Sequence, residues 1–178
     1  MIAELINQNI LQKIILVPCG NRKDKQLTDG LHRYKMLQLL VETKDQLKNI
    51  DSVFIDDYEL QNGQLVPTYY LLQKLREKYQ NVHFVIGSDL VNTLPNWVEG
   101  QKLIAETNFI ILNRSSHKIE QITNLPPKYE LVQNFEYGIS STEIRKRIKN
   151  SKTEYLDCLG VLTPEIIEYI KVNNLYRS

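Results

Sequence analysis

Five short apolar runs, rich in β-branched residues, alternate along the chain with longer segments whose apolar residues recur at helical intervals. The expected strands are residues 14–17, 53–55, 82–86, 109–112 and 129–132. The expected helices are residues 1–11, 31–47, 68–79, 142–149 and 164–172, with two short ones at about 90–94 and 96–107. Strands that alternate with helices form a parallel sheet with right-handed crossovers. We therefore predict an α/β fold in which helices cover both faces of a parallel sheet of about five strands.

Polar segments follow three of the predicted strands at their carboxyl ends. A charged loop at residues 18–25 follows the first strand, two aspartates at 56 and 57 follow the second, and residues 87–89 close the third. In open parallel sheets, ligands bind beyond the carboxyl ends of the strands. The pattern therefore predicts one site at this edge.

Length and charge restrict the class of protein. With 22 basic and 21 acidic residues among 178, the formal net charge is +1, which is not the cationic footprint of a nucleic-acid-binding protein. No apolar run reaches membrane-spanning length. The two cysteines form neither a disulfide framework nor a metal motif, which favours a reducing compartment. We expect one domain over residues 1–178, in the cytoplasm or the nucleus, with neither nucleic acid nor membrane as partner.

The segment after the fifth strand has the composition of an anion-binding helix start. Ser140, Ser141 and Thr142 are good capping residues, and Arg145 lies one turn further on. Free N–H groups, hydroxyls and an arginine at a helix N-terminus bind anions such as phosphate. The same residues fit an ordinary capped surface helix, so this motif alone leaves both interpretations open.

A second candidate group follows the third strand. Gly87 permits close backbone approach, and Asp89 offers a carboxylate for ribose hydroxyls. Trp97, the only tryptophan, can stack on a flat ring. The alternatives are an ordinary turn into the next helix and a tryptophan that only packs. Lys25 and its basic neighbours could collect phosphates or form a solvated loop.

Several motifs stand together in this chain. They are Val17-Pro18 with Arg33 and Met36, Pro67-Thr68, Gly87-x-Asp89 with Leu94 and Trp97, Ile139-Ser-Ser-Thr-x-Ile-Arg145, and Leu162-x-Pro164. Over almost the whole chain, this set resembles the nicotinate/nicotinamide mononucleotide adenylyltransferases, nucleotidylyltransferases of the cytidylyltransferase-like superfamily with a Rossmann-like fold.

The resemblance implies an enzyme of NAD biosynthesis that transfers the adenylyl group of ATP to nicotinate or nicotinamide mononucleotide and releases pyrophosphate. It implies ATP contacts at Gly87, Asp89, Ser140, Ser141, Thr142 and Arg145. It implies mononucleotide contacts at Thr68, Trp97 and Lys25. The cofactor implied is Mg²⁺, bound with ATP, and relatives of this kind are often homo-oligomers.

One part of the family pattern is missing. The family begins with a central strand, a Gly-rich turn and a His-x-x-His-type motif, whereas His32, His83 and His117 form no such pair. We therefore assign no catalytic residue and expect an N-terminally truncated chain. The missing strand predicts a gap between the strands at 14–17 and 82–86, and little or no activity for the 178 residues alone.

Two alternatives stay open at this point. One is a catalytically inactive nucleotide-binding or regulatory relative that keeps the ATP site without the histidines. The other is an adenylyltransferase for another acceptor, such as pantetheine phosphate or a flavin nucleotide. Thr68 and Trp97 at their family spacing favour the pyridine nucleotide, but the sequence does not separate nicotinate from nicotinamide.

Overall fold

The computed structural model describes residues 5, 11–22, 27–43, 52–113, 121–132, 139–152 and 155–177. The expectations for Lys25, His117 and most of the helix at residues 1–11 lie outside these ranges. Of residues 1–11 only Leu5 and Leu11 are described: Leu5 is helical and buried, and Leu11 is not helical. The chain groups into two compact units, Val66–Gly138 and a second one made of Ile2–Leu65 with Ile139–Ser178.

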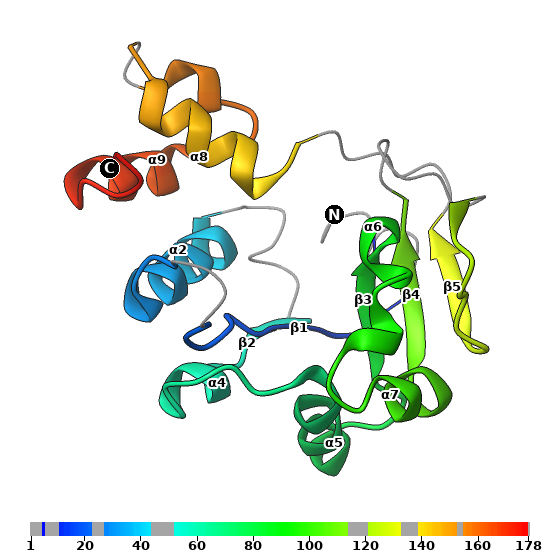
Figure 1. Cartoon of the computed structure of the whole chain (residues 1–178). Helices are drawn as coiled ribbons and strands as arrows, with labels where there is room; N and C mark the ends of the chain where they lie inside the picture. The colour runs from blue at the N-terminus through cyan, green and yellow to red at the C-terminus, as the bar shows by residue number, and fades with distance from the viewer. Residues whose placement is uncertain are drawn as a thin grey trace. The chain divides into compact units, whose positions relative to one another are not determined.

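The unit Val66–Gly138 is built on a three-stranded parallel sheet (Figure 1). Its strands are β3 (His83–Gly87), β4 (Asn108–Leu112) and β5 (Tyr129–Val132), in the order β3-β4-β5. Its helices are α5 (Thr68–Lys78), α6 (Ser88–Val91), the 3₁₀ turn η1 (Leu94–Asn96) and α7 (Gly100–Glu106). The register aligns His83 with Asn108 and Phe109 with Tyr129.

Strand β4 forms the core of this unit. Phe109, Ile110 and Ile111 are fully buried, although successive side chains of a strand point to opposite faces. A continuously apolar strand of this kind needs cover on both faces of the sheet, as the sequence predicts.

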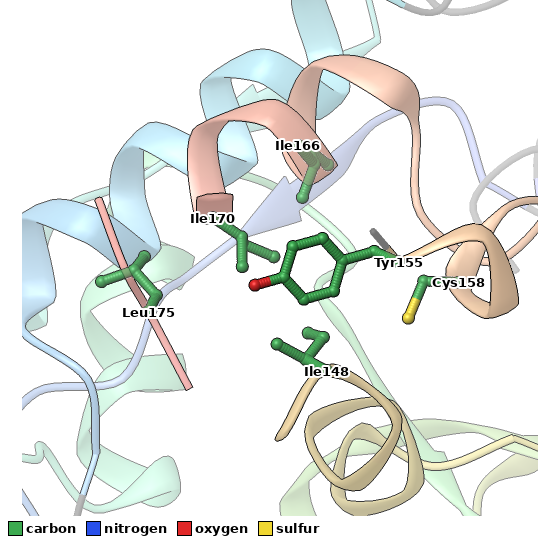
Figure 2. Close-up of a cluster of buried hydrophobic side chains, with 6 residues drawn as sticks. All are labelled: Ile148, Tyr155, Cys158, Ile166, Ile170 and Leu175. Atoms are coloured by element: carbon green, nitrogen blue, oxygen red, sulfur yellow. The ribbon is translucent and has the colours of Figure 1, made fainter. Parts of the chain in front are cut away.

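The other unit pairs β1 (Ile14–Leu16) with β2 (Val53–Ile55) in parallel, with Ile14 opposite Val53. Its helices are α2 (Gly30–Thr43), α4 (Tyr58–Gln61), α8 (Ser141–Asn150), the 3₁₀ turn η3 (Leu156–Cys158) and α9 (Pro164–Val172). Its core is shown in Figure 2 and consists of Ile148, Tyr155, Cys158, Ile166, Ile170 and Leu175. Apolar side chains of α2, including Met36 and Leu40, pack against this cluster.

All five predicted strands are present and parallel, but they form a pair and a triplet. Within the described residues no ladder joins β1 to β3.

Three details of the helices differ from the prediction. The short helix expected at about 90–94 lies at Ser88–Val91. The helix expected at 96–107 begins only at Gly100, because Glu99 has a left-handed backbone (φ 55°) and Pro95 lies in the preceding 3₁₀ turn. A Cβ on Gly100 would lie 2.3 Å from the carbonyl oxygen of Leu94, so only glycine fits this close approach. Helix α4 was not predicted, since four residues are too few to show a helical period. None of the described helices is long and apolar enough to cross a membrane.

Candidate functional site

Helix α8 begins as the sequence predicts. Ser140 is the N-cap residue, in an extended conformation, and its hydroxyl accepts a hydrogen bond from the N–H of Glu143 at 3.1 Å. The carbonyl of Ser140 accepts from the N–H of Ile144 at 3.0 Å. The N–H groups of Ser141 and Thr142 have no partner inside the helix, because the first turn of any helix leaves them unpaired. Both residues are exposed, so their N–H groups and hydroxyls can bind an anion.

Two arginines of α8 differ in how their side chains are held. Arg147 contacts Glu143 at 3.5 Å and donates to the carbonyl oxygen of Asp157 at 3.2 Å. Arg145 is exposed and has no hydrogen-bond or ion-pair partner within the described parts of the chain. It follows Ser141 by four residues and Thr142 by three, so these three side chains share one helical face. Arg145 is therefore the arginine available to an anion at the helix start.

The turn from β3 to α6 holds Gly87 and Asp89. Gly87 is both the last residue of the strand and the N-cap of the helix, with an ordinary extended backbone (φ −76°, ψ 146°). Its conformation therefore does not itself require glycine. Asp89 lies in the first turn of α6, next to the buried Ser88. This places a carboxylate at the carboxyl end of a strand, which is the edge where the sequence predicts a site.

Trp97 is half-buried and held from two sides. Its indole Nε1–H donates to the hydroxyl oxygen of Thr93 at 2.9 Å. Its ring packs edge-on with Phe84 of β3, with centroids 6.2 Å apart and planes at 75°. Part of the indole surface remains exposed. The ring is therefore oriented by the protein and still accessible to a ligand.

Thr68 is the first residue of α5, after Pro67 at the N-cap position. Proline has no side chain that could cap the helix, and no side-chain cap bond is formed there. The N–H groups of the first turn of this 11-residue helix are therefore left for an external acceptor. Thr68 is partly exposed, so its hydroxyl and N–H can take part in such a contact.

A contact network that the sequence did not reveal joins the start of α5 to the segment after Trp97. The hydroxyl of Tyr70 donates to Glu99 Oε1 at 3.3 Å, and Glu99 pairs with Lys102 at 2.9 Å. The Lys102 ammonium, by hydrogen bond and charge, holds the pKa of the Glu99 carboxyl below its usual value. Tyr70 is two residues beyond Thr68 and Glu99 two beyond Trp97, so these two predicted residues lie in segments that contact each other.

The predicted site residues therefore fall into two groups. Gly87, Asp89, Trp97 and Thr68 belong to the unit Val66–Gly138. Ser140, Ser141, Thr142 and Arg145 belong to the other unit, on α8. Lys25 lies outside the described residues. The two described histidines have contacts within the protein: His32 Nδ1 lies 2.8 Å from the Tyr169 hydroxyl, and His83 Nδ1 lies 2.8 Å from the carbonyl oxygen of Asn81.

The chain is similar in sequence to known proteins. A model of the cytidylyltransferase-like family matches residues 1–147. A protein of Acholeplasma laidlawii described as a probable nicotinate-nucleotide adenylyltransferase is 31% identical over 172 residues, which cover 94% of this chain and 83% of that one. The nicotinate-nucleotide adenylyltransferase of Bacillus subtilis is 28% identical over 184 residues, covering 100% of this chain and 89% of the relative.

A solved structure is similar over almost the whole chain. It is the nicotinic acid mononucleotide adenylyltransferase of Plasmodium falciparum complexed with NaAD. The TM-score is 0.82 at 31% sequence identity, and the match covers 99% of this chain and 88% of the other.

Proposed function

Because this chain belongs to the cytidylyltransferase-like family, among its nicotinate-nucleotide adenylyltransferases, we propose that it joins the adenylyl group of ATP to nicotinate mononucleotide. In this reaction an oxygen of the mononucleotide's 5′-phosphate attacks the α-phosphorus of ATP. The bond from that phosphorus to the oxygen bridging to the β-phosphate breaks, and pyrophosphate leaves. The products are deamido-NAD and pyrophosphate, which places the enzyme in NAD biosynthesis.

The proposed binding site for the ATP phosphates rests on the start of α8. Ser141 and Thr142 present N–H groups and hydroxyls beside the exposed guanidinium of Arg145. Phosphoryl transfer requires positioning and charge neutralisation more than covalent help from the protein. Donors that already point at the phosphates provide this without reorganisation during the reaction.

The unit Val66–Gly138 would hold the mononucleotide and the ribose. Trp97 offers an oriented ring for stacking on the pyridine, and Asp89 offers a carboxylate for ribose hydroxyls. The uncapped start of α5 at Thr68 would bind the pyridine substituent. A helix start favours an anion over a neutral amide, which supports nicotinate as the preferred acceptor over nicotinamide.

Mg²⁺ is proposed to bind with ATP. The described part of the chain holds no group of three or more His, Cys, Asp or Glu side chains that could cage a metal ion. This fits Mg²⁺, which keeps several waters and binds through substrate phosphates and one or two carboxylates. When bound, the ion would neutralise phosphate charge, and the role of Arg145 and the α8 start is to position the same phosphates.

The test is pyrophosphate release from ATP in the presence of nicotinate mononucleotide, nicotinamide mononucleotide or no acceptor. It is run on the 178-residue chain and on a chain extended upstream of Met1, so that the low activity expected from the sequence is tested as well. Acceptor-dependent release with nicotinate mononucleotide by either chain supports the proposal. Tight ATP binding without release by either chain would instead indicate the inactive relative.

A further inference from the structure

The hydroxyl of Thr93 makes two hydrogen bonds in the segment between α6 and η1. It donates to the carbonyl oxygen of Leu90 at 2.6 Å. It also accepts from the indole Nε1–H of Trp97 at 2.9 Å. Both distances are in the normal range for such bonds.

The direction of these bonds follows from the chemistry of the two groups. A carbonyl oxygen only accepts and an indole N–H only donates, so the single proton of the Thr93 hydroxyl points to Leu90. Its lone pairs are then left for Trp97. The one hydrogen-bond donor of the Trp97 side chain is thus used within the protein. The ring can therefore contact a ligand by stacking but not by a hydrogen bond from its N–H.

Other contacts hold the same ring. Phe84 packs edge-on with Trp97 and also with Phe109, which is fully buried in β4. The backbone of Trp97 is fixed too, because its N–H donates to Leu94 at 3.1 Å and its carbonyl accepts from Gly100 at 2.9 Å. Rotation about the side-chain bonds is the freedom that remains, and the bond to Thr93 restricts it.

We propose that Thr93 is a positioning residue for the mononucleotide: it sets the plane of the Trp97 indole and occupies its N–H. Trp97 then recognises the flat pyridine by stacking alone. Discrimination between carboxylate and amide is left to other donors, which the proposed function places at the start of α5. The inference rests on that proposed function, in which Trp97 stacks on the pyridine.

The test replaces Thr93 by valine, which keeps the shape of the side chain and removes the hydroxyl. Thr93 is exposed, so the fold should tolerate the change. We expect the Kd of nicotinate mononucleotide to rise roughly two- to fivefold, as for loss of one solvent-exposed hydrogen bond. The Kd of ATP should not change. Thr93→Ser retains the hydroxyl and should restore the Kd of the mononucleotide.

A spectroscopic readout tests the bond itself. With one tryptophan in the chain, a nitrogen-15-labelled sample gives a single indole N–H resonance from Trp97. In the wild type and in Thr93→Ser its hydrogen exchange should be slow, and in Thr93→Val it should be faster. Thr123→Val is the matched control, because Thr123 is an exposed threonine of the same unit whose hydroxyl bonds Asn92 at 3.3 Å.

Failure of the inference can be told from failure of the proposed function by adding Trp97→Ala. If Trp97→Ala leaves mononucleotide binding intact, then the stacking role of Trp97 is wrong. If Trp97→Ala weakens binding but Thr93→Val changes neither indole exchange nor affinity, then Thr93 does not position the ring. Fast indole exchange in the wild-type protein, or loss of affinity in Thr93→Ser equal to that in Thr93→Val, would also overturn the inference.

Discussion

Arg145 and Arg147 lie two positions apart on α8, and their side chains differ in the contacts they make. Arg147 is held by Glu143 and by the carbonyl of Asp157, whereas Arg145 extends from the face that carries Ser141 and Thr142. A guanidinium already bound to a carboxylate has fewer free N–H donors for a phosphate. The proposed ATP contact is therefore specific to one arginine of the pair.

The first prediction concerns these two residues. Arg145→Ala should weaken ATP binding about tenfold or more, because a charge-assisted hydrogen bond contributes roughly 1.5–3 kcal/mol and each ~1.4 kcal/mol is a factor of ten. Arg147→Ala is the matched control and should leave the Kd of ATP unchanged, with a small loss of stability from its exposed ion pair. Calorimetric titration measures both. Equal Kd values for the two variants would remove Arg145 from the ATP site.

At the scale of one element, α8 combines a polar start with an apolar face. Ile144 and Ile148 lie four residues apart and pack with the cluster of Figure 2. The hydroxyl of Ser140 caps the first turn, while Ser141 and Thr142 remain exposed. Capping and ligand binding thus belong to neighbouring residues, and they can be separated by substitution.

Ser140→Ala should lower the free energy of unfolding by about 1 kcal/mol, the usual effect of losing an N-cap side chain. In a chain of this size that corresponds to a Tm lower by roughly 2–4 °C. Ser141→Ala is the control for stability, since its hydroxyl has no partner in the described structure. Thermal unfolding followed by circular dichroism measures the difference. An unchanged Tm for Ser140→Ala would mean that the cap does not stabilise α8.

The elements that the sequence predicts best are those whose signal lies in residues close together along the chain. Apolar runs such as residues 109–112 predict strands because a buried parallel strand must be apolar on both faces. The start of α8 is predictable because capping depends on residues that are adjacent in sequence. The break before α7 is not, because it depends on the left-handed backbone of Glu99 and on the approach of Gly100 to Leu94.

In the candidate site, too, some features can be predicted from the sequence and others cannot. The types of residue at strand ends and helix starts point to phosphate, ribose and an aromatic ring. The bond from Trp97 to Thr93 and the contact of Tyr70 with Glu99 are not visible in any pattern of residue types. They depend on side-chain geometry, which the periodicity of residue types along the sequence does not determine.

At the scale of the whole molecule, the proposed contacts are shared between two units. The proposed phosphate contacts are on α8, and the proposed pyridine and ribose contacts are in Val66–Gly138. Arg145→Ala should therefore weaken ATP binding more than mononucleotide binding, and Trp97→Ala should do the reverse. This separation is expected of a transferase that must bind two nucleotides at once.

The proposed function includes a preference for nicotinate mononucleotide over nicotinamide mononucleotide as the acceptor. The most direct measurement is a competition in which ATP and equal concentrations of the two mononucleotides are incubated with the protein. The dinucleotide products are then quantified by mass spectrometry, and their ratio gives the ratio of the two kcat/KM values. We predict that deamido-NAD exceeds NAD, because an uncapped helix start at Thr68 favours the carboxylate. An excess of NAD would overturn the preference for nicotinate mononucleotide. No dinucleotide from either the 178-residue chain or the extended one would overturn the proposed function.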